Sequence, residues 1–145
     1  MSERPDQPQL LARHIMRQPL HTIQAADSVA LAVRQMQINR ISSLIVPPRY
    51  EGEVYGILTK HDILGKVVAA GRDPLRVLVR EAMSAPLIGV DPDSPLRRCA
   101  SLMMLHRIRR LPVLVAGRPV AMVSDTDVFD ALLNVHTEAA WSASL

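Results

Sequence analysis

Residues 11–20 read LARHIMRQPL, and residues 78–87 read LVREAMSAPL. The second stretch repeats the first 67 positions later, with Met83 in the place of Met16 and the same Pro-Leu pair at its end. Self-similarity at a fixed offset indicates that a chain is built from copies of one structural unit. The sequence therefore predicts two related halves.

The same offset continues beyond these stretches. The matching residues are Val29 with Leu96, Met36 with Met103, Arg40-Ile41 with Arg107-Ile108, Leu44 with Leu111, and Val46 with Val113. At Thr59 and Ser124 the offset falls to 65, so the first copy has two extra residues, and these are placed in the stretch 47–52. Insertions of this kind fall in loops. Each copy has roughly 60 residues, which is small for a stable core, so the two are expected to pack together and share one.

Each copy predicts the element order β-α-β-β-α. Short extended segments at 20–23 and 87–90 lead to helices whose apolar residues recur at i, i+3, i+4 and i+7. These residues are Val29, Ala32, Val33 and Met36 in the first copy, and Leu96, Cys99, Ala100 and Met103 in the second. Asp27 or Ser28 is expected to cap the first helix, and Ser94 with Pro95 forms the corresponding cap and first turn.

Two apolar runs follow each helix and predict a hairpin. The runs are 41–46 with 54–58 in the first copy, and 111–115 with 120–123 in the second. A last helix is expected to begin near Lys60 and near Asp125.

Composition limits the kinds of function. The chain has 145 residues, of which 48% are hydrophobic, 3% aromatic and 21% charged. So few aromatic side chains argue against the base-stacking surfaces of RNA- and single-strand-binding domains. The single cysteine, Cys99, cannot form an internal disulfide or a cysteine-based zinc site. Without a signal peptide or an apolar run long enough to span a bilayer, the chain is expected to be cytoplasmic, with no membrane segment.

The basic residues are mostly arginine. The net charge is +3, which gives only weak nonspecific attraction to nucleic acid. However, 15 of the 17 basic residues are Arg, whose planar guanidinium suits a phosphate held in a fixed geometry. Most of them are expected to be solvated surface residues.

Both hairpins end in a hydroxyl residue followed three positions later by aspartate: Thr59 with Asp62, and Ser124 with Asp127. Two interpretations are open. The pattern resembles a helix capping box, in which both side chains only satisfy backbone groups. The same groups can also bind a nucleotide, because a helix N-terminus attracts phosphate and a carboxylate accepts hydrogen bonds from ribose hydroxyls.

Together these features resemble a tandem pair of CBS domains, called a Bateman module. The resemblance rests on the repeated Met-x-x-Pro-Leu, on Arg-Ile-Arg-Arg-Leu-Pro-Val at 107–113 and on the two Thr/Ser-x-x-Asp ends, and it covers about residues 10–135. It implies an α+β fold in which two βαββα repeats pack with pseudo-twofold symmetry into one module. The expected parts are a disordered N-terminus (1–9), the first repeat (10–68), a linker (69–77), the second repeat (78–136) and a C-terminal tail (137–145).

The resemblance also implies two clefts between the repeats that hold an adenosine ligand: AMP, ADP, ATP or S-adenosylmethionine. By their places in the family motif, Asp62 and Asp127 inherit ribose binding, and Thr59 and Ser124 inherit contacts to phosphate or ribose. The backbone of the two opening strands would line the adenine pockets, through Leu20, His21, Thr22, Ile23, Ile88 and Gly89.

In this family, the residues just before the second strand of each repeat point toward the phosphates. Here they are Ser42-Ser43 in the first repeat, and Arg109 and Arg110 in the second. Because guanidinium groups can clamp a phosphate with paired hydrogen bonds, the Asp127 site is expected to prefer a phosphorylated adenosine and to be the better occupied. The alternative is that both arginines are solvated at the start of a strand.

Other candidate residues are expected to be structural. Cys99 corresponds to Ala32 on a buried helix face and predicts a core thiol, and Met36, Met103 and Met104 predict core packing. No catalytic residue and no metal site is expected, because the histidines form no zinc-binding motif. The five are His14, His21, His61, His106 and His136. Trp141 in the tail either packs across a dimer or is frayed.

The sequence thus predicts a stand-alone regulatory module and not an enzyme. It would bind adenosine nucleotides, as in energy sensing, and signal as a homodimer to an unidentified partner protein. Two alternatives stay open: a protein-interaction scaffold with empty clefts, and, less favoured, a nucleic-acid-binding protein whose affinity would depend steeply on salt.

Overall fold

The computed structural model describes residues 9–132, and contacts divide the chain into two compact units. One unit combines the N-terminal stretch up to Pro19 with the chain from Ile88 onward, and we call it the split unit. The other, Leu20–Leu87, is the continuous unit. The predicted tail, with Trp141, and His136 lie outside the described residues, as does all of the predicted disordered N-terminus except Gln9.

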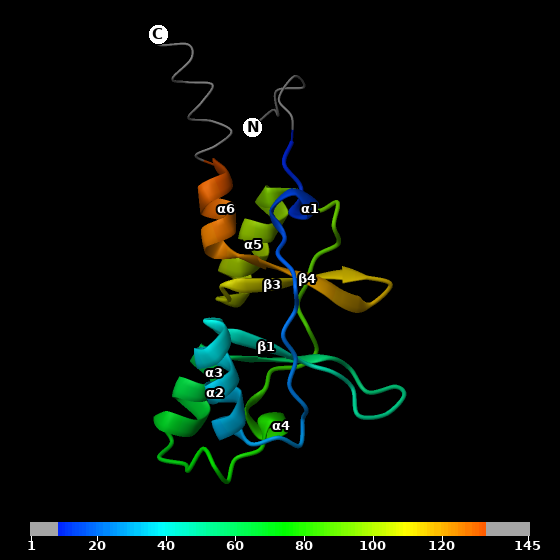
Figure 1. Cartoon of the computed structure of the whole chain (residues 1–145). Coiled ribbons are helices and arrows are strands. Elements are labelled where there is room, and N and C mark those ends of the chain that lie inside the picture. The colour runs from blue at the N-terminus through cyan, green and yellow to red at the C-terminus, as the bar shows by residue number, and fades with distance from the viewer. Residues whose placement is uncertain (1–8, 133–145) are drawn as a thin grey trace. The chain divides into compact units, whose positions relative to one another are not determined.

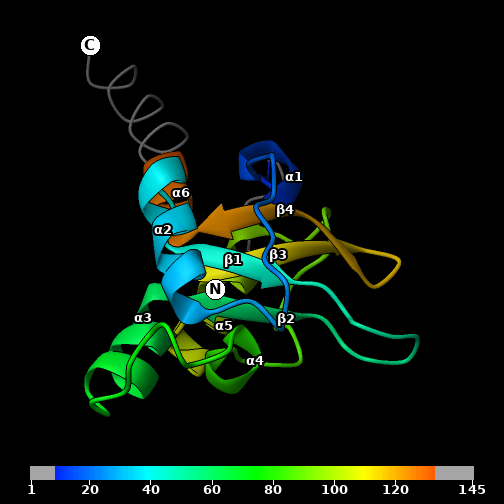
Figure 2. The ribbon, with the colours of Figure 1, turned by 60° about the horizontal axis from the view of Figure 1, so that its bottom comes forward.

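The continuous unit contains the helix and hairpin of the first repeat. Its elements are α2 (Val29–Asn39), β1 (Ser43–Val46), β2 (Gly56–Thr59), α3 (Lys60–Ile63), the π-helical turn η1 (Leu64–Val68) and α4 (Val79–Ala82). Strands β1 and β2 pair antiparallel from Ser43↔Thr59 to Val46↔Gly56. Figure 2 shows this hairpin with its loop directed away from α2 and α3. The helix and hairpin predicted for the first repeat are therefore confirmed.

The split unit contains the corresponding elements of the second repeat. They are α1 (Ala12–Ile15), α5 (Leu96–His106), β3 (Arg110–Val115), β4 (Arg118–Ser124) and α6 (Asp125–Leu132). Strands β3 and β4 pair antiparallel, with a register shift between Val113 and Leu114. Helices α5 and α6 lie side by side in this unit (Figure 1). Here too the predicted helix, hairpin and final helix are confirmed.

We call residues 11–19 and 78–86 the opening segments of the two repeats. Each packs with the hairpin and long helix of the other repeat. Four antiparallel bridges show this exchange: Leu11↔Pro95 and Arg17↔Met122 in the split unit, and Ser28↔Leu78 and Ile57↔Ser84 in the continuous unit. Each bridge in one unit has its counterpart in the other at the offsets of the sequence repeat. The repeat seen in the sequence therefore holds in the backbone, although the compact units cut across it.

The predicted first strands are extended but short. Thr22 bridges Ile45 in parallel, and Val90 bridges Val113 in the same way. Neither segment forms a longer strand within the described part of the chain, so each sheet has two full strands. A single parallel bridge joins the extended segment to the first of these strands.

Buried apolar side chains of the described residues form one cluster in each unit. The continuous unit has Val29, Leu44, Leu58, Val67 and Val77 among its buried residues, and the split unit has Ala12, Cys99, Met103, Leu111 and Val123. Each cluster includes residues from the exchanged segments, such as Ala12 and Val79. The exchange thus supplies each hairpin and helix with an additional apolar layer.

Two local predictions are wrong. The N-cap of α5 is Pro95, which has no side chain able to cap, and Ser94 is instead buried one position earlier with an unpartnered Oγ. Met104 is 75% exposed, whereas Met36 and Met103 are buried as predicted. Met104 follows Met103 directly on α5, so it lies on a different side of the helix.

By contrast, Ser28 caps α2 as expected, because its side chain accepts a hydrogen bond from the Leu31 N–H. Among residues 9–132, no helix is both long enough and apolar enough to cross a membrane.

Candidate functional site

The two Thr/Ser-x-x-Asp stretches form equivalent turns between a hairpin and the helix that follows it. In the split unit, the Asp127 N–H donates to Ser124 Oγ and the Ser124 N–H donates to Asp127 Oδ2, both at 3.0 Å. In the continuous unit, the Asp62 N–H donates to Thr59 Oγ1 at 3.1 Å and the Thr59 N–H donates to Asp62 Oδ2 at 3.0 Å. Both turns are reciprocal capping boxes, so the capping interpretation is confirmed in each repeat.

The Asp127 carboxylate is buried in the first turn of α6, with its side chain only 7% exposed. While Oδ2 serves the capping box, Oδ1 accepts a hydrogen bond from Arg17 Nε at 2.8 Å. Arg17 comes from the opening segment, and its backbone bonds to Met122 on β4 in both directions, at 2.9 and 3.1 Å. The pairing satisfies a carboxylate that would be costly to bury alone.

The Asp62 carboxylate has a different set of partners. Oδ2 also accepts from the Thr59 hydroxyl at 2.9 Å, and Oδ1 accepts from Ser84 Oγ at 3.1 Å. Lys66 Nζ lies 3.4 Å from Oδ1 and donates to the Ala82 carbonyl at 2.9 Å. A hydroxyl therefore occupies the position at Asp62 that a guanidinium occupies at Asp127.

Sequence reasoning missed these partners. Arg17 and Ser84 follow the methionine of the two Met-x-x-Pro-Leu stretches directly and occupy the same place in the repeat. The repeat alignment contained this pair, but nothing local in the sequence indicated that the position faces an aspartate far along the chain.

The two arginines at the start of β3 differ in their surroundings. Arg110 Nη1 donates to the Arg109 carbonyl at 3.0 Å and lies 3.4 Å from Asp125 Oδ1. The Arg109 side chain is exposed and has no polar partner among residues 9–132, although its carbonyl accepts from the Asp125 N–H at 3.0 Å. The first residue of α6 is thus tied to Arg109, directly before β3. The Arg109 guanidinium is exposed to solvent, while Arg110 is partly neutralised by Asp125.

The extended segment 20–23 lies along β1 of its own repeat. The Ile23 N–H donates to the Ile45 carbonyl, and the Ile45 N–H donates to the His21 carbonyl, at 3.0 and 2.9 Å. Ile23 is buried, Leu20 and His21 are half-buried and Thr22 is exposed. These backbone edges are therefore engaged with β1.

The extended segment 87–90 lies along β3. The Val90 N–H donates to the Pro112 carbonyl at 3.0 Å, and Ile88 and Gly89 are half-buried. A Cβ at position 89 would lie 2.6 Å from the Pro112 oxygen, so the backbones approach closely there. The structure thus brings Ile88 and Gly89 beside β3 of the unit that contains Asp127.

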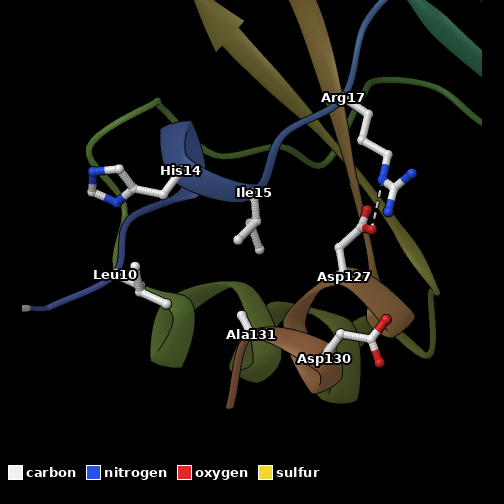
Figure 3. A pocket seen from close by; sticks show the side chains of 7 residues that line it. All are labelled: Leu10, His14, Ile15, Arg17, Asp127, Asp130 and Ala131. Carbon is white, nitrogen blue, oxygen red and sulfur yellow. Dashed lines mark hydrogen bonds and ion pairs between the residues drawn. The ribbon is translucent and has the colours of Figure 1, made fainter. Parts of the chain in front are cut away.

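A pocket of about 350 Å³ lies between the opening segment and α6 in the split unit (Figure 3). Its lining comprises Leu10, His14, Ile15, Arg17, Asp127, Asp130 and Ala131. Of the predicted site residues only Asp127 takes part. The Arg17–Asp127 pair lies at one end of this lining, with the apolar side chains of Leu10 and Ile15 at a distance from it (Figure 3).

Other reactive side chains are placed as the sequence suggests. Cys99 is fully buried, and burial raises the pKa of its thiol, which disfavours the nucleophilic thiolate. His14, His61 and His106 are exposed and His21 is half-buried. Within residues 9–132 no group of three or more His, Cys, Asp or Glu side chains could hold a metal ion.

The CBS domain family model matches residues 12–69 and 79–134. A CBS domain-containing protein of Bacillus subtilis is 34% identical over 125 residues, which are 86% of this chain and 81% of that protein. A mitochondrial CBS domain-containing protein of Arabidopsis thaliana is 33% identical over 115 residues, 77% of this chain but only 56% of that protein. The hexameric CBS-CP12 protein from bloom-forming cyanobacteria has a TM-score of 0.78 and 38% identity, over 83% of this chain and 69% of its own.

Proposed function

Because the chain belongs to the CBS-domain family, a type of regulatory module that typically binds adenosine ligands, we propose that it binds an adenosine nucleotide and thereby regulates a partner protein. A ligand that binds one arrangement of the protein more tightly shifts the population toward that arrangement. In this proposal the protein is a binding module with no catalytic role.

The observation that carries the proposal is the pair of equivalent turns at Asp62 and Asp127. Each turn presents a hydroxyl, a carboxylate and the N-terminus of a helix within one short stretch. A carboxylate held in this way can accept hydrogen bonds from ribose hydroxyls, and the helix N-terminus favours a nearby phosphate. The capping roles of Thr59 and Ser124 position these groups for a ligand.

The proposal favours a phosphorylated ligand at Asp127. Arg109 is exposed without a polar partner in the described part of the chain, so its guanidinium is available to an anion. Arg110 is the next residue along the chain, although its Nη1 already lies 3.4 Å from Asp125 Oδ1. The corresponding residues of the first repeat, Ser42 and Ser43, carry no charge. AMP, ADP and ATP are therefore the ligands of choice at this turn, ahead of S-adenosylmethionine.

A homodimer stays a prediction, and the long helices support it. Ile38 on α2 and Leu105 on α5 are exposed at corresponding positions of the repeat, as are Leu64 in η1 and Phe129 on α6. Exposed apolar side chains that recur at the same two places mark a surface suited to association. Three further expectations stay predictions: a regulated partner protein, clefts between the repeats, and a cytoplasmic location.

Thermal unfolding with and without ligand tests the proposal. At a concentration about 100 times Kd, AMP, ADP or ATP should stabilise the native state by about 2.7 kcal/mol and raise Tm by roughly 5–10 °C. Asp127→Asn should lose most of this rise, each variant being compared with its own ligand-free Tm. The matched control is Asp130→Asn, one turn further along α6, which should keep the full rise.

Absence of any shift with AMP, ADP, ATP or S-adenosylmethionine at millimolar concentration would reject the proposal and favour a scaffold. An Asp127→Asn variant that responds like the native protein would instead move the site elsewhere. Binding to DNA or RNA that weakens steeply with added salt would support the nucleic-acid alternative.

A further inference from the structure

We infer that Arg17 selects the ligand at the Asp127 turn and makes that site specific for adenosine ligands that carry a phosphate group. This inference rests on the proposed function and names the ligand class. Arg17 belongs neither to the Thr/Ser-x-x-Asp motif nor to the pair of arginines before β3. It can select the ligand because it already binds the carboxylate that a ribose would need.

Each oxygen of the Asp127 carboxylate already accepts a hydrogen bond in the free protein. Oδ2 accepts from the Ser124 N–H, and Oδ1 accepts from Arg17 Nε at 2.8 Å. The aspartate side chain is 7% exposed, whereas the Arg17 side chain is 77% exposed. The guanidinium therefore covers Oδ1 from the solvent side, and its two terminal nitrogens have no partner among residues 9–132.

The other repeat provides an internal comparison. At the position that corresponds to Arg17 stands Ser84, whose hydroxyl donates to Asp62 Oδ1 at 3.1 Å. Ser84 has no charge, so it cannot form an ion pair with a phosphate. A ribose that displaced it from Asp62 would release a neutral hydroxyl and no cation. At this position of the repeat, one aspartate therefore has a neutral donor and the other a permanent cation. The cation near Asp62 is Lys66 of η1, which lies 3.4 Å from Oδ1 and also donates to the Ala82 carbonyl.

Because the Asp127 side chain is only 7% exposed and Oδ1 is bonded to Arg17, a ribose that approaches from solvent competes with the guanidinium for Oδ1. The hydrogen bond it breaks is charge-assisted, and such bonds are roughly twice as strong as neutral ones. A phosphate on the same ligand offers the released guanidinium a new anionic partner, with the fork geometry that arginine matches best. Adenosine offers no such partner. S-adenosylmethionine carries a carboxylate, but its sulfonium and ammonium groups offset that charge and repel the guanidinium.

The backbone keeps Arg17 close enough for this exchange. Its N–H and carbonyl both bond to Met122, two residues before Ser124. The pivot of the side chain is thus fixed beside the turn, while the exposed guanidinium can move. Release from Asp127 would leave it near the ribose site.

Isothermal titration of the full chain with AMP, adenosine and S-adenosylmethionine tests the inference. The native protein should bind AMP about tenfold or more tightly than adenosine at the site that Asp127→Asn removes. Arg17→Ser, which installs the residue of the other repeat, should reduce this preference by about threefold or more, and the preference that remains is the part due to Arg109 and Arg110. The matched control is Arg13→Ser, which removes a positive charge from α1 that pairs with Asp93 and not with Asp127.

The outcomes separate the two proposals. If AMP binds but Arg17→Ser leaves the AMP-to-adenosine ratio as in the native protein, Arg17 is not the selector, although the proposed function stands. If Arg13→Ser lowers the preference for AMP over adenosine as much as Arg17→Ser does, the preference arises from net charge and the inference about Arg17 is rejected. If no adenosine ligand binds any variant, both proposals are rejected. Arg17→Gln gives the same comparison should Arg17→Ser fail to fold.

Discussion

At position 89, the space for a single Cβ atom determines which residue can be accommodated. It is one of the positions expected to line an adenine pocket, and the structure gives it a steric role that needs no ligand. A Cβ there would lie 2.6 Å from the Pro112 carbonyl oxygen and 3.0 Å from two carbons of Leu114. The backbone at Pro112 cannot move aside as the tip of a flexible side chain can, so the close approach of segment 87–90 to β3 requires glycine at position 89.

We therefore expect Gly89→Ala to lower the free energy of unfolding by about 1–3 kcal/mol, the usual effect of overpacking. The matched control is Gly65→Ala, because a Cβ at position 65 meets nothing within 4 Å. This control should be neutral or stabilise by up to about 1 kcal/mol through better helix propensity. Urea unfolding of both variants measures the difference, and equal values would contradict the steric argument.

At the scale of elements, α2 and α5 are the same helix of the repeat with different beginnings. Both have eleven residues and end at a left-handed arginine, Arg40 or Arg107, with φ of 53° and 54°. At the N-terminus, Ser28 accepts a hydrogen bond from the Leu31 N–H at 3.1 Å. The α5 helix instead has Pro95 at its N-cap, with no side-chain hydrogen bond. The two helices therefore depend on their preceding serines to different degrees.

Ser28→Ala should reduce the free energy of unfolding by about 1 kcal/mol, because it removes the partner of an otherwise unpaired N–H. Ser94→Ala should change it by less than about 0.5 kcal/mol or stabilise the protein, because the Ser94 Oγ is buried without a partner. Chemical denaturation of the two variants side by side provides the measurement. A larger loss from Ser94→Ala would show that its hydroxyl caps α5 after all.

At the scale of the whole molecule, the exchange of opening segments sets which parts of the chain are stable together. The Ala12 and Arg17 N–H groups donate to Ser94 and Met122 in the split unit. The Val79 and Ser84 N–H groups donate to Asp27 and Ile57 in the continuous unit. Protection of the Ala12 and Arg17 amides from hydrogen exchange should therefore depend on the stability of the second repeat. Protection of the Val79 and Ser84 amides should depend on the stability of the first repeat.

Native-state hydrogen exchange tests this with two corresponding core positions. Val123→Ala in β4 should lower the exchange free energy of the Ala12 and Arg17 amides by roughly 2 kcal/mol, and that of the Val79 and Ser84 amides by less. Leu58→Ala, the matching change in β2, should have the reverse effect. Protection that instead followed the order of the chain, with Ala12 responding to Leu58→Ala, would contradict the exchange.

Local patterns in the sequence determined the repeat, its helices and hairpins, and the pair of aspartate turns. These features arise from periods of a few residues and from a capping motif spanning four positions, so a short window contains their cause. Ser28, Cys99 and the hairpin ends are where the pattern puts them. Ser94 and Met104 differ because the position of a helix end and the width of its buried face depend on what packs against it.

Tertiary structure alone decided which segments share a unit and what covers each carboxylate. Arg17 and Asp127 are 110 positions apart, and their hydrogen bond exists because the first opening segment lies along β4 of the second repeat. No local pattern encodes such a meeting, since it depends on the path of the backbone between the two residues. The sequence could thus identify the aspartates as candidate ribose ligands. Only the fold shows that Oδ1 of one accepts a hydrogen bond from an arginine, whereas Oδ1 of the other accepts one from a serine and lies near a lysine.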